Sequence, residues 1–309
     1  MRSRRIVVQV GCAVFGVVIA MLSAPASNGV LAQGAPSRPS AAPLPSGDQI
    51  ITRYEQALGG GAALAKVTTR TTRTRRIVDL GAPSDHLLVR HSKRGPGGAP
   101  MSIMNHGDLT GQFMYWLNGC DGKTGWQRGD KDAIRDADTL TGGICEHEQA
   151  FYGYFVLDAA RMRKNLRLEV RGIYKIVPTE VGAFGELAGG KGRDLVPAGA
   201  RDTYLVYGVS TGKDAPAWLF FDVETGFLLR RGETGEGATP VPPGDSPRVT
   251  DFLQYREVGD GTRMPFQFVT FGGPNRTRGV HVEVIDNAPI DDKVFIKPKV
   301  GSRQDKGIS

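Results

Sequence analysis

The sequence has little of what catalytic and metal sites usually require. Its 309 residues include three cysteines and five histidines. It contains no Cys-x-x-Cys-His motif, so the motif for covalent haem attachment is missing. It also lacks the Gly-x-Ser-x-Gly nucleophile elbow of serine hydrolases. The segment Gly189-Gly190-Lys191-Gly192 lacks the Ser or Thr that completes a phosphate-binding loop. We therefore predict no catalytic residue and no cofactor.

One segment, Cys145-Glu146-His147-Glu148, combines metal-binding residue types, with Cys120 and His106 as further candidates. Structural zinc sites normally use paired ligands on both halves of the site, and this spacing matches no zinc signature. Acidic residues at the start of a helix also interact favourably with its dipole. We predict no metal here. An enzyme with a Cys/His/Glu metal site ranks behind two non-enzymatic hypotheses.

The first 32 residues have the pattern of an export signal. Basic residues at 2–5 precede an apolar run at 10–22 and small residues at 24–26 and 30–32. We predict a signal peptide over 1–32, cleaved after Ala26 or Ala32, that includes Cys12 and directs the protein to the periplasm. The apolar run is shorter than the ~20 residues that a membrane-spanning helix needs, which favours a cleaved signal over the alternative of a retained membrane anchor.

Removing the signal changes the charge and leaves two cysteines. It holds three arginines and no acidic residue, so the formal charge falls from +7 to +4. The remaining positive charge is small and no nucleic-acid-binding motif accompanies it, so we predict no nucleic-acid partner. Because the exported compartment favours disulfides, Cys120 and Cys145 are a candidate disulfide; two separate buried thiols are the alternative.

The remaining chain begins with a linker and a helix. Residues 33–47 are rich in Ala, Pro, Ser and Gly and predict a disordered linker. Ser46 and Gln49 form a capping-box pattern, which predicts a helix ending at the glycines of 59–61 and a second short helix at 62–67. We predict one domain over residues 48–298 and a C-terminal tail over residues 299–309.

Strand patterns dominate the domain. β-branched and aromatic residues between Gly, Pro and Asp turns predict strands at 68–78, 86–91, 101–105, 112–117, 126–128, 168–177, 203–209, 218–222, 227–231, 249–258, 267–271 and 280–285. So many consecutive strands predict a mainly β fold with an antiparallel sheet or barrel. One amphipathic helix is predicted at 146–165, and its aromatic face needs an apolar partner such as the concave side of the sheet.

Two other sequence patterns predict local structure. Asp121-Gly-Lys-Thr-Gly125 and Asp222-Val-Glu-Thr-Gly226 predict two similar hairpin turns. The basic run Arg70, Arg73, Arg75 and Arg76 divides its charges between the two faces of a strand. We interpret it as a solvated strand near the sheet edge, with recognition of anionic lipid headgroups or nucleic acid as the alternative.

Aromatic residues cluster around these hairpins and line either a packed core or an apolar cavity. Alternation of side chains across a curled sheet allows about half of them to face its interior. The candidate cavity residues are Tyr115, Trp126, Phe151, Phe155, Met162, Trp218 and Phe220.

Several segments together resemble the periplasmic outer-membrane lipoprotein-sorting proteins of the LolA and LolB type. They are the helix ending in Ala57-Leu58-Gly59-Gly60, the turn at 121–126, and the segments 218–229, 255–266 and 287–295, within a resemblance that spans 48–298. The chain departs from the family in its insertion at 180–201 and in lacking a match to the mobile lid. The resemblance implies an unclosed half-barrel, formed by a curled antiparallel sheet, whose concave face is covered by helices and holds acyl chains.

The resulting hypothesis is a non-enzymatic periplasmic carrier of lipids or of the acyl chains of lipoproteins. Envelope membrane proteins are the other expected partners. The alternative is a non-catalytic envelope scaffold or accessory protein whose barrel is solidly packed.

Overall fold

The computed structural model describes residues 43–80, 82–95, 100–108, 116–128, 134–136, 163, 166–179, 194–210, 217–233, 248–259, 261–272 and 276–299. The chain divides into two units, Met1–Ala32 and Gln33–Ser309, and every described residue belongs to the second unit. The predicted signal peptide, most of the linker and the end of the tail therefore lie outside the described residues. So does the helix predicted at 146–165, except for Arg163, which is helical.

The N-terminal helix α1 (Gly47–Ala57) begins where the capping box predicts. Ser46 Oγ accepts a hydrogen bond from the Gln49 backbone N–H at 3.2 Å, and the Gln49 side chain accepts from the Ser46 backbone N–H at 2.7 Å. Gly59 follows the helix with a φ of +117°, and a Cβ there would lie 2.4 Å from the Gly261 carbonyl oxygen. A side chain at position 59 would thus be strained and would clash. The short helix α2 (Gly61–Lys66) follows.

The described strands form one antiparallel sheet of 13 strands. They are β1 (Thr69–Leu80), β2 (Ala82–Arg94), β3 (Pro100–Asp108), β4 (Trp116–Cys120), β5 (Gly125–Arg128), β6 (Ile134–Asp136), β7 (Leu166–Ile176), β8 (Arg201–Ser210), β9 (Ala217–Asp222), β10 (Leu228–Glu233), β11 (Val249–Val258), β12 (Thr262–Phe271) and β13 (Arg276–Asp286). A 3₁₀ helix, η4 (Asp292–Phe295), follows β13.

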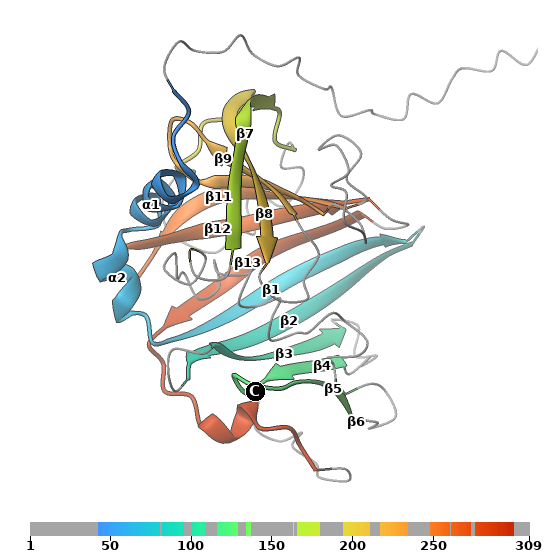
Figure 1. Cartoon of the computed structure of the whole chain (residues 1–309). Helices are drawn as coiled ribbons and strands as arrows, with labels where there is room; N and C mark the ends of the chain where they lie inside the picture. Colours follow the sequence, from blue (N-terminus) through green and yellow to red (C-terminus); the bar gives the residue numbers. More distant parts are fainter. Residues whose placement is uncertain are drawn as a thin grey trace, which may run out of the picture. The chain divides into compact units, whose positions relative to one another are not determined.

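The sheet is open. Its order is β6-β5-β4-β3-β2-β1-β13-β12-β11-β10-β9-β8-β7, so β6 and β7 stand at opposite ends (Figure 1). The chain folds as two meanders, and β1 joins them by pairing with β13. The predicted mainly β, unclosed half-barrel is confirmed. Among the described strands, the prediction omitted only β6, whose three residues are too few to show alternation.

The two similar Asp-to-Gly turns have similar geometry. Asp121 Oδ1 accepts from the backbone N–H groups of Lys123 and Thr124 at 2.9 and 2.8 Å. Asp222 Oδ1 accepts from those of Glu224 and Thr225 at 3.0 and 2.6 Å. The aspartate at the start of each turn therefore organises the hairpin, as the sequence predicts.

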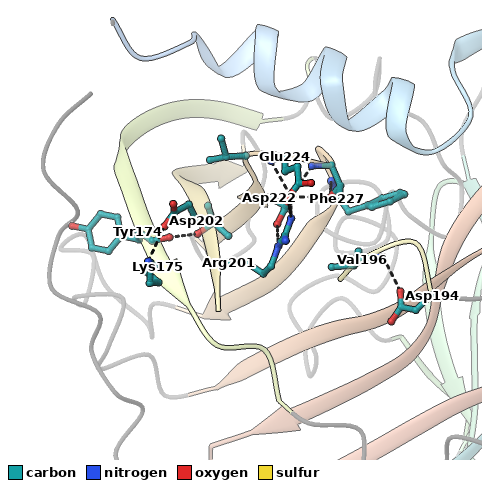
Figure 2. A network of polar contacts seen from close by, with 12 residues as sticks. Tyr174, Lys175, Asp194, Val196, Arg201, Asp202, Asp222, Glu224 and Phe227 are labelled. Carbon is teal, nitrogen blue, oxygen red and sulfur yellow. Dashed lines mark hydrogen bonds and ion pairs between the residues drawn. The ribbon is translucent and has the colours of Figure 1, made fainter. Parts of the chain in front are cut away.

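Asp222 has an additional partner that Asp121 lacks in its described contacts. Arg201 donates from Nε to Asp222 Oδ2 at 2.7 Å and from Nη2 to Oδ1 at 3.0 Å, and also contacts Glu224 (Figure 2). Burial raises the pKa of Asp222, but the hydrogen bonds from Arg201 and Thr225 outweigh it and hold that pKa below its usual value. This ion pair joins the beginning of β8 to the end of β9.

The interpretation of the basic run as a strand near the sheet edge is wrong. Arg70, Arg73, Arg75 and Arg76 lie on β1, which is hydrogen-bonded on one side to β2 and on the other to β13. A positively charged edge strand and a charged central strand share the same alternating sequence pattern, and the pairing of β1 depends on a strand about 200 residues away. The split of these arginines between two faces agrees with the register.

Candidate functional site

One face of the sheet is covered by α1, and we call it the helix-side face. Tyr54 of α1 packs edge-on against Phe221 of β9, with ring centroids 5.4 Å apart. Arg53 donates from Nη2 to the Val223 carbonyl oxygen at 2.7 Å, and the Arg53 carbonyl oxygen would lie 3.0 Å from a Cβ at Gly226. The glycine of the β9–β10 turn therefore allows α1 to approach the sheet closely.

The strand register extends this face across the sheet. Directly opposed residues of antiparallel strands share a face, as do alternate residues along a strand. From β9 to β1, one row of opposed residues consists of Leu219, Arg231, Thr250, Thr270, Thr277 and Val78. The rest of the helix-side face follows by alternation from this row.

The part of this face nearest α1 is apolar. Ile50, Ile51 and Tyr54 of α1 form one buried cluster with Leu219 and Phe221 of the sheet. Burial raises the pKa of Tyr54, which keeps its phenol neutral. This cluster fixes the helix over β8 and β9.

The apolar surface continues toward the centre of the sheet. The aromatic residues there are Phe252, Phe266 and Phe268. The ring of Phe268 lies directly over Gly279, where a Cβ would come within 2.0 Å of it. Gly279 thus makes room for an aromatic ring on the backbone of β13.

A polar strip borders these aromatic residues on the same face. By alternation and pairing it consists of Arg70, Thr72, Thr74 and Arg76 of β1, Arg90 and Ser92 of β2, and His281 of β13. All except Arg76 and Arg90 are buried, and those two arginines are half-buried. Burying so many polar groups is unfavourable unless each has a partner, so the strip is an unusual interior surface.

Arg70 is held in place by a buried ion pair. Its Nε and Nη2 donate to the two carboxylate oxygens of Asp286 at 2.6 and 2.7 Å, and Nη2 also reaches Thr262 Oγ1 at 3.3 Å. This two-point geometry fixes the guanidinium plane on the helix-side face. The Arg70 side chain has only 2% of its surface exposed.

His281 is neutral at this position. Its Nδ1 is 2.7 Å from Thr74 Oγ1, and its ring approaches those of Phe266 and Phe268 with centroids 6.3 and 6.0 Å apart. Burial lowers the pKa of His281 to about 3, with further lowering by the charges of Arg70 and Arg90. His281 is therefore a hydrogen-bonded sheet residue that lies near Arg70, Arg90 and two aromatic rings.

The described cavity candidates do not form one group. Trp126 is buried with Met101, Ile103 and Phe295, and its indole N–H donates to the Phe295 carbonyl oxygen at 3.2 Å. Trp218 and Phe220 belong to the separate cluster that includes α1. By alternation from Leu219, however, both lie on the face opposite the helix-side face.

The other site predictions involve undescribed residues. Tyr115, Phe151, Phe155 and Met162 lie outside the described residues, and their place in a cavity stays a prediction. Cys120 is buried, and its Sγ lies 3.3 Å from the Gly122 backbone nitrogen. Cys145 is outside the described residues, so the Cys120–Cys145 disulfide also stays a prediction.

Two features are absent from the residues described above. No group of three or more His, Cys, Asp or Glu side chains is placed there to hold a metal ion. No helix among them is long and apolar enough to cross a membrane. The whole 145–148 segment considered for zinc lies outside the described residues.

The open sheet and its covering helix define a LolA-like fold, which confirms the resemblance at the level of architecture. A domain assigned as an outer membrane lipoprotein-sorting protein from Vibrio parahaemolyticus matches 81% of this chain and 95% of its own, with 9% identity and a TM-score of 0.51. A DUF1329 family protein from Desulfovibrio piger matches the same shares, with 11% identity and a TM-score of 0.51. No family model matches the sequence, and no curated protein sequence matches it either.

Proposed function

We propose that this protein is a non-enzymatic carrier that binds lipids, or the acyl chains of lipoproteins, on the helix-side face of its open sheet. The observation that carries the proposal is the apolar section of this face, between α1 and the polar strip, in an unclosed LolA-like sheet. Transfer of an acyl chain from water to such a surface gains about 0.8 kcal/mol per methylene group, so binding needs no catalytic residue. The predicted signal peptide supports action in the periplasm, where lipids must cross water.

The experiment compares two phenylalanines of one strand. Phe268 and Phe271 are both half-buried on β12, three residues apart, so their side chains lie on opposite faces. We would measure uptake of a fluorescent fatty acid by the mature protein and by the variants Phe268→Leu and Phe271→Leu. The proposal predicts uptake by the wild type, weaker binding by Phe268→Leu and little change in Phe271→Leu.

A third variant, Phe220→Leu, tests the cavity candidates of the opposite face. Weaker binding in Phe220→Leu with normal binding in Phe268→Leu would move the ligand to that opposite face. A folded wild-type protein that takes up no fatty acid would refute the carrier function. It would instead support the alternative of an envelope scaffold with a packed core.

A further inference from the structure

The long sheet is discontinuous between β12 and β13. Over their described residues these strands pair at only four positions, which begin next to their hairpin and end at Gln267 opposite Val280. By contrast, β11 pairs with β12 at nine positions and β1 pairs with β13 at ten. The two strands diverge away from their hairpin (Figure 1). We call the boundary between the beginning of β12 and the end of β13 the split.

A β-bulge in β13 explains where the split begins. In the pairing of β13 with β1, the register shifts between His281 and Glu283, which leaves Val282 as an extra residue. A bulge bends its strand and increases the local twist. Val280 is the last residue of β13 that pairs with β12, and Val282 follows two residues later. The bulge therefore turns β13 away from β12.

The two N-terminal helices are bound on opposite sides of the split. At the end of α1, the Leu58 carbonyl oxygen accepts a hydrogen bond from the Arg263 backbone N–H of β12 at 2.9 Å. At the end of α2, the carbonyl oxygens of Leu64 and Val67 each accept from the Arg94 side chain of β2 at 3.1 Å. The boundary thus continues from the sheet into the connection between α1 and α2.

These contacts divide the described structure into two parts. The α1 part consists of α1 and β7 to β12, and the α2 part consists of α2, β1 to β6, β13 and η4. The chain crosses between them at the β12–β13 hairpin and at Gly59 and Gly60, whose φ values are +117° and +84°. Glycine adopts such backbone angles at little cost, and hinges usually lie at loops or at the ends of elements.

Arg70 of the α2 part reaches across the split. Its Nη2 donates to Thr262 Oγ1 at 3.3 Å and its Nη1 donates to Met264 Sδ at 3.5 Å, both on β12. Val284 of β13 also packs against the buried cluster that includes Phe266 of β12. Side-chain contacts such as these can separate without unpairing any strand.

The helix-side face extends over both parts. Its aromatic residues Phe252, Phe266 and Phe268 belong to the α1 part. The polar strip belongs to the α2 part, as does Gly279, over which the Phe268 ring lies. A movement of one part relative to the other would therefore change the surface on which a ligand lies.

We propose that the two parts move as units about the β12–β13 hairpin and the glycines between α1 and α2, and that this motion opens the helix-side face to admit and release the ligand. The contact of Arg70 with Thr262 and Met264 holds the parts together in the closed arrangement. The inference rests on the proposed carrier function and adds the conformational change by which the carrier is loaded.

The first test measures the distance between the two parts. Spin labels are attached at exposed positions, one in each part for Lys175→Cys/Lys123→Cys and both in the α1 part for Lys175→Cys/Glu257→Cys. Double electron–electron resonance is recorded with and without palmitate, and label-treated wild type is the blank for the native cysteines. We expect bound palmitate to shift the distance between the parts by more than about 2 Å and to leave the control distance unchanged.

The second test needs no ligand. Thr262→Val removes the hydroxyl group that Arg70 contacts across the split. Thr270→Val is the matched control, because Thr270 is a buried threonine of the same strand whose hydroxyl contacts Thr250 within the α1 part. With labels on both parts, Thr262→Val should broaden the distribution of distances and Thr270→Val should not. Circular dichroism and thermal unfolding would verify that each variant is folded.

The outcomes separate the hinge from the carrier function. An unchanged distance between the parts while palmitate is bound would overturn the hinge and leave the carrier function intact. A folded protein that binds no palmitate would overturn both, because the motion would have no ligand to admit. Equal distributions in Thr262→Val and Thr270→Val would show that the Arg70 contact does not hold the parts together.

Discussion

The turn that begins at Asp222 gives a quantitative prediction because the chain contains an internal control. Asp222 and Asp121 cap similar turns through the same backbone hydrogen bonds, but only Asp222 is described in a pair with an arginine. The Asp222 side chain is fully buried, and 11% of the Arg201 side chain is exposed. Replacing each aspartate by asparagine keeps a side chain that can cap the turn and removes the charge.

The expected magnitudes differ for the two positions. Removing one partner of a buried ion pair costs about 3–5 kcal/mol, because the remaining charge is left in a poorly solvated place. Asn favours turns as Asp does, so Asp121→Asn should cost at most about 1 kcal/mol. Glu224, which also contacts Arg201, is 73% exposed, and Glu224→Gln should change stability by at most about 1 kcal/mol.

Urea unfolding of the mature protein, followed by circular dichroism at neutral pH, would provide these values. The reasoning requires Asp222→Asn to lower the free energy of unfolding by several times the loss in Asp121→Asn. Equal losses at the two positions would show that the Arg201 pair adds nothing beyond the turn, and would refute the argument.

The ion pair between Asp222 and Arg201 also predicts how the stability of the protein changes at acidic pH. The pKa of Asp222 in the folded protein lies below its ordinary value of 3.8, so its stabilising contribution is complete above that value. The contribution is lost as the pH falls through the folded pKa. Asp222→Asn should therefore be less stable than the wild type at neutral pH, and the difference should shrink below pH ~4.

Three further predictions follow from single contacts. Since the pKa of His281 falls from 6.5 to about 3 on folding, the unfolded chain takes up a proton that the folded protein excludes, and stability should decrease on acidification below 6.5. This linkage is worth about 2 kcal/mol at pH 5, and a His281→Gln variant that folds should lack it in urea titrations at pH 7 and pH 5. Gly119→Ala should lower the thermal midpoint by several degrees, because a Cβ there would lie 2.2 Å from the Trp126 ring. Gly226→Ala should be destabilised by about 1–3 kcal/mol in urea, since Gly226 has a φ of +80° and a Cβ would lie 3.0 Å from the Arg53 carbonyl oxygen.

Local signals in the sequence predicted much of the fold. The Ser46 and Gln49 capping box placed the beginning of α1, and runs of β-branched and aromatic residues between turn residues placed most strands. The Asp121 and Asp222 turns were visible because their hydrogen bonds are made within a few residues. These features depend on neighbours in the sequence.

The candidate site was harder to predict because it depends on distant pairing. Arg70 and Asp286 are 216 residues apart, and Thr74 and His281 are 207 residues apart. Nothing local indicates that β1 pairs with β13, so the basic run was interpreted as an edge strand. The alternation of its arginines did indicate that Arg70 and Arg76 share one face. What the sequence did not show is that this face is buried in the folded protein.

The central claim is that the open sheet carries lipid, and mass spectrometry of the protein isolated from its native compartment tests this claim most directly. The protein would be purified without detergent, sprayed under native conditions and then extracted with organic solvent. The account predicts an intact mass above that of the mature chain and an extract that contains a lipid or acyl chain. A folded protein at the mass of the bare chain, which also takes up no acyl chain from liposomes, would contradict it.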